Sequence, residues 1–339
     1  MAVDHDAGAI DHIDVESDEL LGSSRAMTSQ IHVRVPLSEP SASSAHVVDI
    51  DALERAVHDA LSIFHDVERI CTRFDPASPL SLVNAKPTQW HVVPEILFEA
   101  VAEAHAAYDR TGGRFDPRVL KNLLALGYER SLPFEVANVV TTPDARPPRG
   151  WSTSPWGFRK DREIHSIHLD GTPIDLGGIG KGLAVRWASD RLARDSDHYL
   201  VEAGGDCYCA GRSLDGEAWR VGIEDPHGGN DPVAVLAVSD RSIATSSTRL
   251  RHWCSGATPV HHLIDPRTGQ PGGDGLSAVT VIDDDPARAE VWSKVLFLEG
   301  ALGIDLAARD HGIDAFWIRD DHSFSHSDTI VASLLWTAS

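Results

Sequence analysis

The chain has 339 residues, and 51 Asp and Glu against 30 Lys and Arg give a formal net charge of −21. Hydrophobic residues make up 42% and charged residues 24%, values typical of globular domains with a sizeable core. The acidic balance argues against nucleic acid and against an anionic membrane surface as partners, because both require clustered Lys and Arg.

The N-terminal segment is strongly acidic, with seven carboxylates in the first twenty residues and no Lys or Arg before Arg25. We expect residues 1–25 to form a disordered acidic tail and residues 26–339 to form the folded domain. No cationic start precedes an apolar run, and no apolar stretch approaches the ~20 residues that cross a bilayer. Four cysteines do not form a disulfide framework. These features predict a cytoplasmic protein.

The first half of the chain contains one predicted strand and two predicted helices. Gln30–Val35 alternates apolar and polar residues, the pattern of a half-buried strand. Apolar residues at helical spacing predict an amphipathic helix over Asp51–Arg73. A second helix is predicted over Pro94–Asp109, with a proline at its start and two glycines after its end. The proline-containing stretch Val136–Trp156 predicts a loop that could act as a flexible flap.

The second half alternates short strands with two predicted helices, Lys181–Arg194 and Pro286–Leu298, and a further helical turn follows Gly303. The predicted strands are Ser166–Leu169, Tyr199–Glu202, Trp219–Ile223, Val233–Val238, Ala278–Ile282 and Ala315–Ile318. There is no strict β-α-β rhythm. We therefore expect an α+β fold, with mixed or antiparallel sheets and helices packed outside, rather than a doubly wound sheet.

The glycine-rich segment Asp175–Gly182 joins a strand end to a helix start. Exposed backbone amides and the helix N-terminus suit a phosphate group. The segment is not a P-loop, because Asp175 stands where that motif needs its first glycine and Gly182 stands where it needs Ser or Thr. A tight packing turn is the alternative interpretation. Lys181 lies in this segment and is one of only five lysines in the chain.

Three later segments also combine turn residues with polar side chains at strand ends, where loops carry ligand contacts. They are Val201–Asp206, Ile243–Ser247 and His261–Gly269. A Ser-His-Asp set could be assembled from Ser246, His262 and Asp265, but no nucleophile-elbow sequence supports it.

Taken in chain order, these segments resemble the FAD:protein FMN transferases, the ApbE-like flavin transferases, over about residues 26–300. The matching segments are Met27-Thr28 (the family's Met-Gly-Thr without its glycine), Thr72–Ser78 with Asn84, Gly113–Pro117, Asp175–Gly182 with Gly180 in place of alanine, Gly204–Asp206, Ile223–Pro226, Ala244–Ser246 and His262–Gly269.

The resemblance implies the ApbE-like fold and a protein that binds FAD. With Mg²⁺, such a protein cleaves the FAD pyrophosphate, transfers FMN to a threonine hydroxyl of an acceptor flavoprotein and releases AMP. It implies that His262 is the base for the incoming hydroxyl and that Lys181 supplies positive charge. The residues that it places at the FAD site are Met27, Phe74, Arg114, Phe115, Asp116, Asp175, Lys181 and His262.

The resemblance also implies a metal site built from the Gly178 carbonyl and the start of a helix, where the family has Asp and Thr. This chain has Glu290 and Lys294 at those two positions. Residues four apart share a helix face and can pair. We expect Lys294 to substitute for the metal; the alternative is that Lys294 turns to solvent and Mg²⁺ binds through Gly178, Glu290 and water.

Two classes of function remain open at this point. The first is an enzyme, either an FMN transferase or an FAD pyrophosphatase in which water replaces the threonine. The second is a non-catalytic protein that binds FAD or another nucleotide on the same fold.

Overall fold

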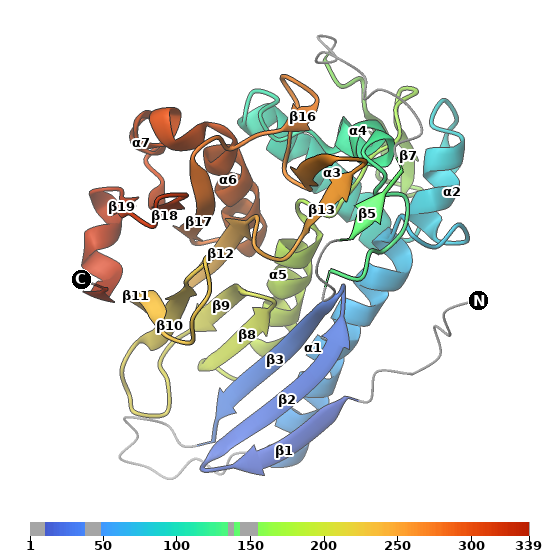
Figure 1. Cartoon of the computed structure of the whole chain (residues 1–339). Helices are drawn as coiled ribbons and strands as arrows, with labels where there is room; N and C mark the ends of the chain where they lie inside the picture. Colours follow the sequence, from blue (N-terminus) through green and yellow to red (C-terminus); the bar gives the residue numbers. More distant parts are fainter. Residues whose placement is uncertain (1–10, 38–48, 135–138, 143–154, 339) are drawn as a thin grey trace.

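The computed structural model describes residues 11–37, 49–134, 139–142 and 155–338, and a long sheet forms its centre (Figure 1). Neighbouring strands in this nine-stranded sheet are antiparallel throughout. In spatial order the strands are β1 (His12–Glu16), β2 (Glu19–Ala26), β3 (Ser29–Pro36), β8 (Tyr199–Ala203), β9 (Asp206–Ala210), β12 (Arg241–Ser247), β17 (Leu276–Asp283), β18 (Asp314–Arg319) and β19 (Phe324–His326).

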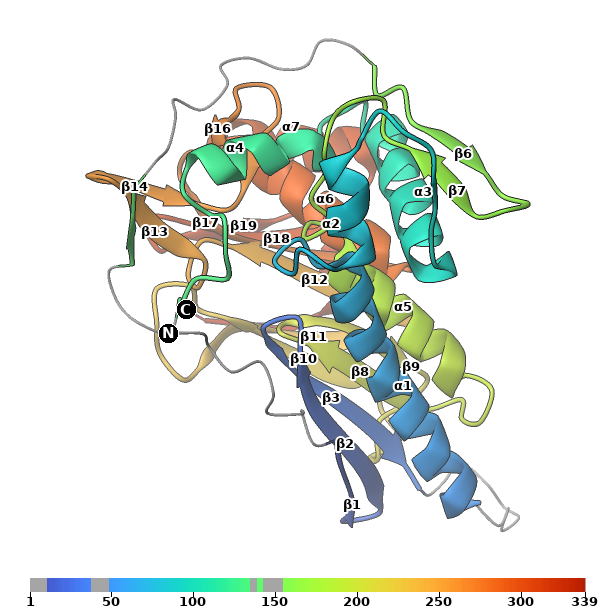
Figure 2. The ribbon, with the colours of Figure 1, turned by 90° about the vertical axis from the view of Figure 1, so that its right-hand side faces the viewer.

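Two helices cover one face of this sheet at its N-terminal end (Figure 2). In β3, Ile31, Val33 and Val35 are buried while the residues between them are exposed. Their face packs against α1 (Ile50–Cys71) and α5 (Gly180–Leu192), which contribute their apolar sides to the same core. The buried faces of β3 and α1, two elements that the sequence predicted separately, therefore pack together in one core.

The other end of the sheet is covered on both faces. In β17, Val279 and Val281 face α6 (Pro286–Leu298) and α7 (Gly300–His311), whereas Ala278 and Ile282 face a small sheet. That sheet consists of β10 (Trp219–Glu224), β11 (Pro232–Val238) and β20 (Leu334–Thr337). A strand buried on both faces reads as a continuous apolar run, which explains the apolar sequence of β17.

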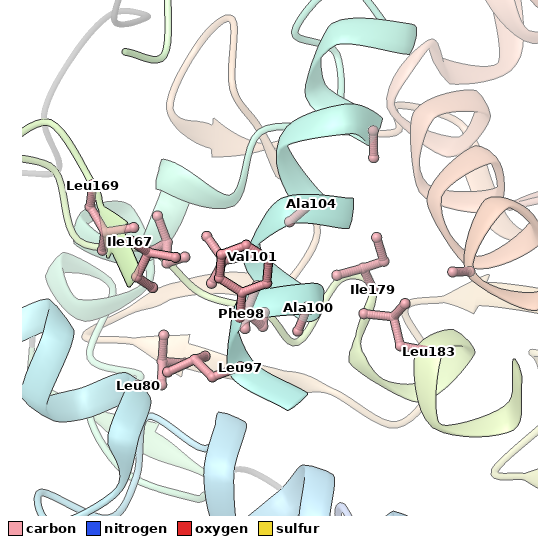
Figure 3. Close-up of a cluster of buried hydrophobic side chains, with 14 of the residues drawn as sticks. Leu80, Leu97, Phe98, Ala100, Val101, Ala104, Ile167, Leu169, Ile179 and Leu183 are labelled. Carbon is pink, nitrogen blue, oxygen red and sulfur yellow. The ribbon is translucent and has the colours of Figure 1, made fainter. Parts of the chain in front are cut away.

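A third core supports the glycine-rich segment (Figure 3). It lies between α2 (Pro79–Ala85), α3 (Glu95–Arg110) and β7 (Ser166–His168), and it includes Ile179 and Leu183. Ile174 and Leu176 are buried in the same core, so apolar anchors hold the glycine-rich segment on both sides.

The remaining elements are short, and all except the last one named, which packs against β11 and β18, lie around the helical half. They are β4 (His91–Val92), β5 (Val140–Thr141), β6 (Arg159–Asp161), β13 (His252–Ser255), β14 (Thr258–His261), β15 (Ile264–Asp265), β16 (Gln270–Pro271), α4 (Leu120–Ala125) and the 3₁₀ helices η1 (Pro117–Val119) and η2 (Thr329–Ser333). Most of the predicted loop over Val136–Trp156 lies outside the described residues. Across the described ranges, no helix combines the length and the apolar character that a membrane crossing requires.

The predicted α+β fold with antiparallel sheets is confirmed, and the predicted disordered tail is wrong from residue 12 onward. β1 and β2 form the edge of the large sheet, and Leu20 is fully buried. β2 buries mainly small side chains beside Leu20, and a Cβ on Gly22 would lie only 2.3 Å from Val57 of α1. Small residues give little hydrophobic periodicity, which is why a charge-based interpretation missed this strand. Residues 1–10 lie outside the described residues.

Candidate functional site

A pocket lies where several of the segments identified in the sequence meet. Its walls come from the end of α1, the segment around η1, the glycine-rich turn before α5, the segments before β13 and after β14, and α6. The lining residues are Arg73, Phe74, Arg114, Phe115, Asp116, Pro117, Val119, Leu123, Tyr128, Asp175, Gly177, Gly178, Arg251, His262, Leu263, Ile264, Pro266, Lys294 and Leu298. Of the sequence-predicted site residues, Met27, Lys181 and Glu290 are not in this wall.

Phe74 and Tyr128 form an aromatic part of the wall. Their ring centroids are 5.5 Å apart, and the guanidinium carbon of Arg73 lies 4.2 Å from the Phe74 ring and 4.6 Å from the Tyr128 ring. Phe74 is 38% exposed although it is apolar. An exposed ring at the edge of a pocket can stack on a planar heterocycle.

Arg73 links this aromatic wall to the glycine-rich turn. Its Nε lies 2.5 Å from Oδ2 of Asp175, and its Nη1 donates to the Tyr128 carbonyl at 2.7 Å. Oδ1 of Asp175 accepts from the Gly177 amide at 2.7 Å. Among the described residues, the buried Nη2 of Arg73 has no hydrogen-bond partner. The pair fixes the turn and leaves one buried guanidinium donor at the pocket.

The glycine-rich turn serves both packing and the pocket. A Cβ on Gly182 would lie 2.5 Å from the Pro286 carbonyl oxygen, so α5 and α6 approach closely there. A Cβ on Gly178 would lie 3.0 Å from the Phe115 ring. Gly177 and Gly178 line the pocket. Close packing of α5 and α6 therefore explains the glycine at position 182. At Gly177 and Gly178 the absence of a side chain exposes the backbone to the pocket.

Asp116 and Arg114 both line the pocket, but Asp116 is buried and Arg114 is partly exposed. The buried Asp116 carboxylate accepts from Nη2 of Arg118 at 2.7 Å and from the Arg118 amide at 2.9 Å. Its charge is therefore used to hold η1. Arg114 is half-exposed, and its Nε donates to Glu299 at 2.8 Å.

Lys181 and Met27 lie behind the wall rather than in it. The Lys181 ammonium is 2.5 Å from Oδ2 of Asp206, whose other oxygen accepts from the Thr245 amide at 3.0 Å. The Met27 amide donates to Glu68 at 2.9 Å. Lys181 thus ties α5 to the central sheet, and in this structure it does not reach the pocket directly.

His262 is held in one tautomer by the backbone. Its Nδ1 lies 3.2 Å from the Arg251 carbonyl oxygen, which can only accept, so Nδ1 carries the proton and Nε2 keeps its lone pair. Burial, followed by the positive charges of Arg251 and Lys294, holds the pKa of His262 well below its ordinary value of 6.5. The ring is therefore neutral at pH 7 and keeps its Nε2 lone pair, although the same lowering of its pKa makes it a weak base.

Arg251 is a pocket cation without a carboxylate partner among the residues that the structure describes. Its Nη2 donates to Oγ1 of Thr28 at 3.1 Å. Met27 and Thr28 form the β2–β3 turn with positive φ angles of 55° and 61°. This charge is available to an anionic ligand.

The Ser-His-Asp alternative is not supported by the geometry. The hydroxyl of Ser246 pairs with that of Ser293 at 2.8 Å, and Asp265 pairs with Arg267 at 3.0 Å. Since His262 uses its Nδ1 on a carbonyl, neither residue activates or orients it.

The positions implied for Mg²⁺ hold an ion pair. Lys294 lies 3.0 Å from Oε1 of Glu290, as the i, i+4 spacing predicted, and Oε2 of Glu290 accepts from the Gly182 amide at 2.8 Å. Burial alone would raise the pKa of Glu290, but Lys294, Lys181 and the Gly182 amide outweigh it and lower that pKa. Among the described residues, no three His, Cys, Asp or Glu side chains converge as metal ligands. These residues do not fit a Mg²⁺ ion.

Sequence reasoning missed Tyr128 and Arg251 and did not single out Arg73 within its motif. Arg73 and Asp175 are 102 residues apart, and Arg251 reaches the site through the β12–β13 connection. Arg73 stands next to the matched Phe74, and this neighbourhood was its only signal in the sequence.

Comparisons with known proteins identify the relatives of this chain. A family model described as the ApbE family matches residues 27–317. FAD:protein FMN transferase of Treponema pallidum is 27% identical over 81% of this chain and 80% of its own length. FAD:protein FMN transferase of Salmonella typhimurium is 28% identical over 67% of this chain and 65% of its own length.

Solved structures support the same fold. The ApbE protein of Thermotoga maritima superposes with a TM-score of 0.73 at 22% identity, covering 97% of this chain and 100% of its own. The family model covers most of this chain, including every pocket-lining residue. The chain belongs to the ApbE family.

Proposed function

We propose that this protein is an FAD:protein FMN transferase, which moves FMN from FAD to a threonine hydroxyl of an acceptor flavoprotein and releases AMP. The observation that carries the proposal is one pocket that combines an exposed aromatic ring, Phe74, with a neutral histidine, His262, and with the cations Arg251 and Lys294. The names of the curated relatives support the same reaction.

Each part of the pocket suits one part of FAD. Phe74 is the exposed ring and would stack on the flavin, while the buried Arg73 and Tyr128 would hold Phe74 in place. The backbone at Gly177 and Gly178, together with Arg251 and Lys294, would surround the pyrophosphate. Lys181 would act through its ion pair with Asp206, which holds the start of α5 in place.

The chemical step is a phosphoryl transfer. The threonine oxygen attacks the FMN phosphorus, the bond from that phosphorus to the bridging oxygen breaks, and AMP leaves with the bridging oxygen. Nε2 of His262 would take the threonine proton, because Nδ1 is committed to the Arg251 carbonyl. The protein's own contribution is to position the reactants and to stabilise the charge that develops on the phosphate oxygens.

The test is incubation of the purified protein with FAD and an acceptor flavoprotein domain, with a threonine-to-valine acceptor as the control. Transferase activity gives AMP and FMN covalently bound to the threonine acceptor only. Free FMN and AMP with either acceptor would instead identify an FAD pyrophosphatase. FAD binding without AMP release would identify a non-catalytic binding protein, and His262→Asn should abolish AMP release if the proposal holds.

A further inference from the structure

Lys294 is a pocket cation whose side chain packs beside the glycine-rich turn. It lies one turn after Glu290 on α6, and its side chain is 16% exposed. A Cβ on Gly178 would lie 3.5 Å from Cδ and 3.6 Å from Cε of Lys294. The ammonium is therefore held between the backbone that lines the pocket and a buried carboxylate.

Glu290 has no free oxygen for a metal. Its side chain is 1% exposed, Oε2 accepts from the Gly182 amide, and Oε1 accepts from Lys294. A Mg²⁺ ion at this carboxylate would have to displace the ammonium and would then lie beside a like charge. The ion also prefers about six oxygen ligands in octahedral geometry, and the Gly178 carbonyl with one carboxylate oxygen leaves most of that shell to water.

The neighbouring hydroxyl does not replace the missing threonine. Ser293 precedes Lys294 on α6, but its Oγ donates to the Glu290 carbonyl at 2.9 Å and pairs with Ser246 at 2.8 Å. Ser293 is fully buried on the side of β12. No hydroxyl group is thus presented to the pocket from this turn of α6.

We propose that the Lys294 ammonium is the resident cation of this site and takes the place of a divalent metal ion toward the pyrophosphate of a dinucleotide. The proposal rests on the proposed function, and it adds that FAD binding is independent of divalent cations. Glu290 holds the ammonium in position, and the Gly182 amide holds Glu290.

The first test uses Mn²⁺ alone, observed by electron paramagnetic resonance without any flavin. We expect the wild-type protein to leave millimolar Mn²⁺ free. Lys294→Thr, which releases Oε1 of Glu290, should bind Mn²⁺ at least about tenfold more tightly, the effect of ~1.4 kcal/mol. Equal Mn²⁺ binding by the two proteins, or micromolar binding by wild type, would overturn the proposal. This test stands even if FAD is not the ligand.

The second test measures FAD affinity by calorimetry in EDTA and in Mg²⁺. We expect the same affinity in both buffers for wild type. Lys294→Met should weaken FAD binding about tenfold or more, the loss of one charge-assisted contact. Lys160→Met, which removes an exposed lysine on β6, is the matched control and should not change it. The Glu290→Gln, Lys294→Met double variant avoids an unpaired buried carboxylate and should show the same loss. The proposal would be contradicted by a much lower FAD affinity in EDTA than in Mg²⁺, or by an unchanged affinity in both Lys294 variants.

Discussion

Arg73 and Asp175, which lie 102 residues apart in the chain, form an ion pair with 2.5 Å between Nε and Oδ2. Their side chains are 5% and 14% exposed. The pair joins the C-terminal end of α1 to the turn that precedes α5, and it fixes one side of the pocket.

Removing the guanidinium should destabilise the protein strongly. Arg73→Met leaves Asp175 buried without its partner, so we expect unfolding to become easier by about 3–5 kcal/mol. Urea denaturation followed by circular dichroism measures this change. Arg309→Met is the control, because its pair with Asp305 is more than half exposed and such pairs contribute about 0–1 kcal/mol. Similar losses for both variants would show that burial does not increase the contribution of the Arg73–Asp175 pair to stability.

The N-terminal hairpin should contribute to stability. Leu20→Ala creates a cavity against α1, and we expect a loss of about 2–5 kcal/mol. Val15→Ala on β1 should cost less than about 0.5 kcal/mol, since Val15 is 53% exposed. Thermal unfolding of both variants gives the comparison, and an unchanged melting temperature for Leu20→Ala would mean that β2 does not hold the core in solution.

Two glycines of α5 should respond differently to the same substitution. A methyl group on Gly182 would meet the Pro286 carbonyl at 2.5 Å, so Gly182→Ala should cost about 1–3 kcal/mol and weaken FAD binding. A methyl group on Gly180 would make an ordinary contact of 3.4 Å with the flexible end of Met27. Gly180→Ala should be neutral or slightly stabilising, because alanine favours the helix. Denaturation and FAD titration of the two variants provide the measurement. A loss confined to Gly182→Ala supports close packing of α5 and α6, and equal losses would show that any substitution in this turn is harmful.

His262 should make the protein more sensitive to acid. Its pKa lies well below the value of 6.5 that it has in the unfolded chain. Below pH 6.5 the unfolded state therefore binds a proton that the folded state refuses, and stability falls as pH decreases. We expect His262→Asn to lose part of this dependence, which can reach about 1.4 kcal/mol per pH unit for one group. Stability curves from pH 7.5 to 5 test this, with the exposed His58→Asn as the control.

The sequence predicted the helices and strands in which apolar residues recur at regular helical or strand spacing. α1, α3, β3 and β17 have strong patterns, and their predicted ranges agree with the structure to within a few residues. β2 and β12 were missed because small and polar residues such as Gly22, Ser24 and Ser246 occupy their buried positions.

Contacts between distant segments account for what the sequence could not show at the site. The Glu290–Lys294 pair lies within one helix and was predictable from spacing alone. The engagement of Glu290 by the Gly182 amide depends on how closely α5 and α6 pack. The placement of Lys181 on Asp206 likewise depends on the antiparallel sheet.

The pocket draws its walls from residues 73 to 298, which is most of the folded chain. No single element contains enough of it to bind a ligand, so the pocket exists only once the helical half and the sheet have come together. A ligand that occupies it stabilises the whole molecule, by about 2.7 kcal/mol at a concentration one hundred times its dissociation constant. If the ligand is a flavin, as proposed, the fraction of the protein that is folded should rise with the flavin concentration. This effect does not depend on the catalytic rate.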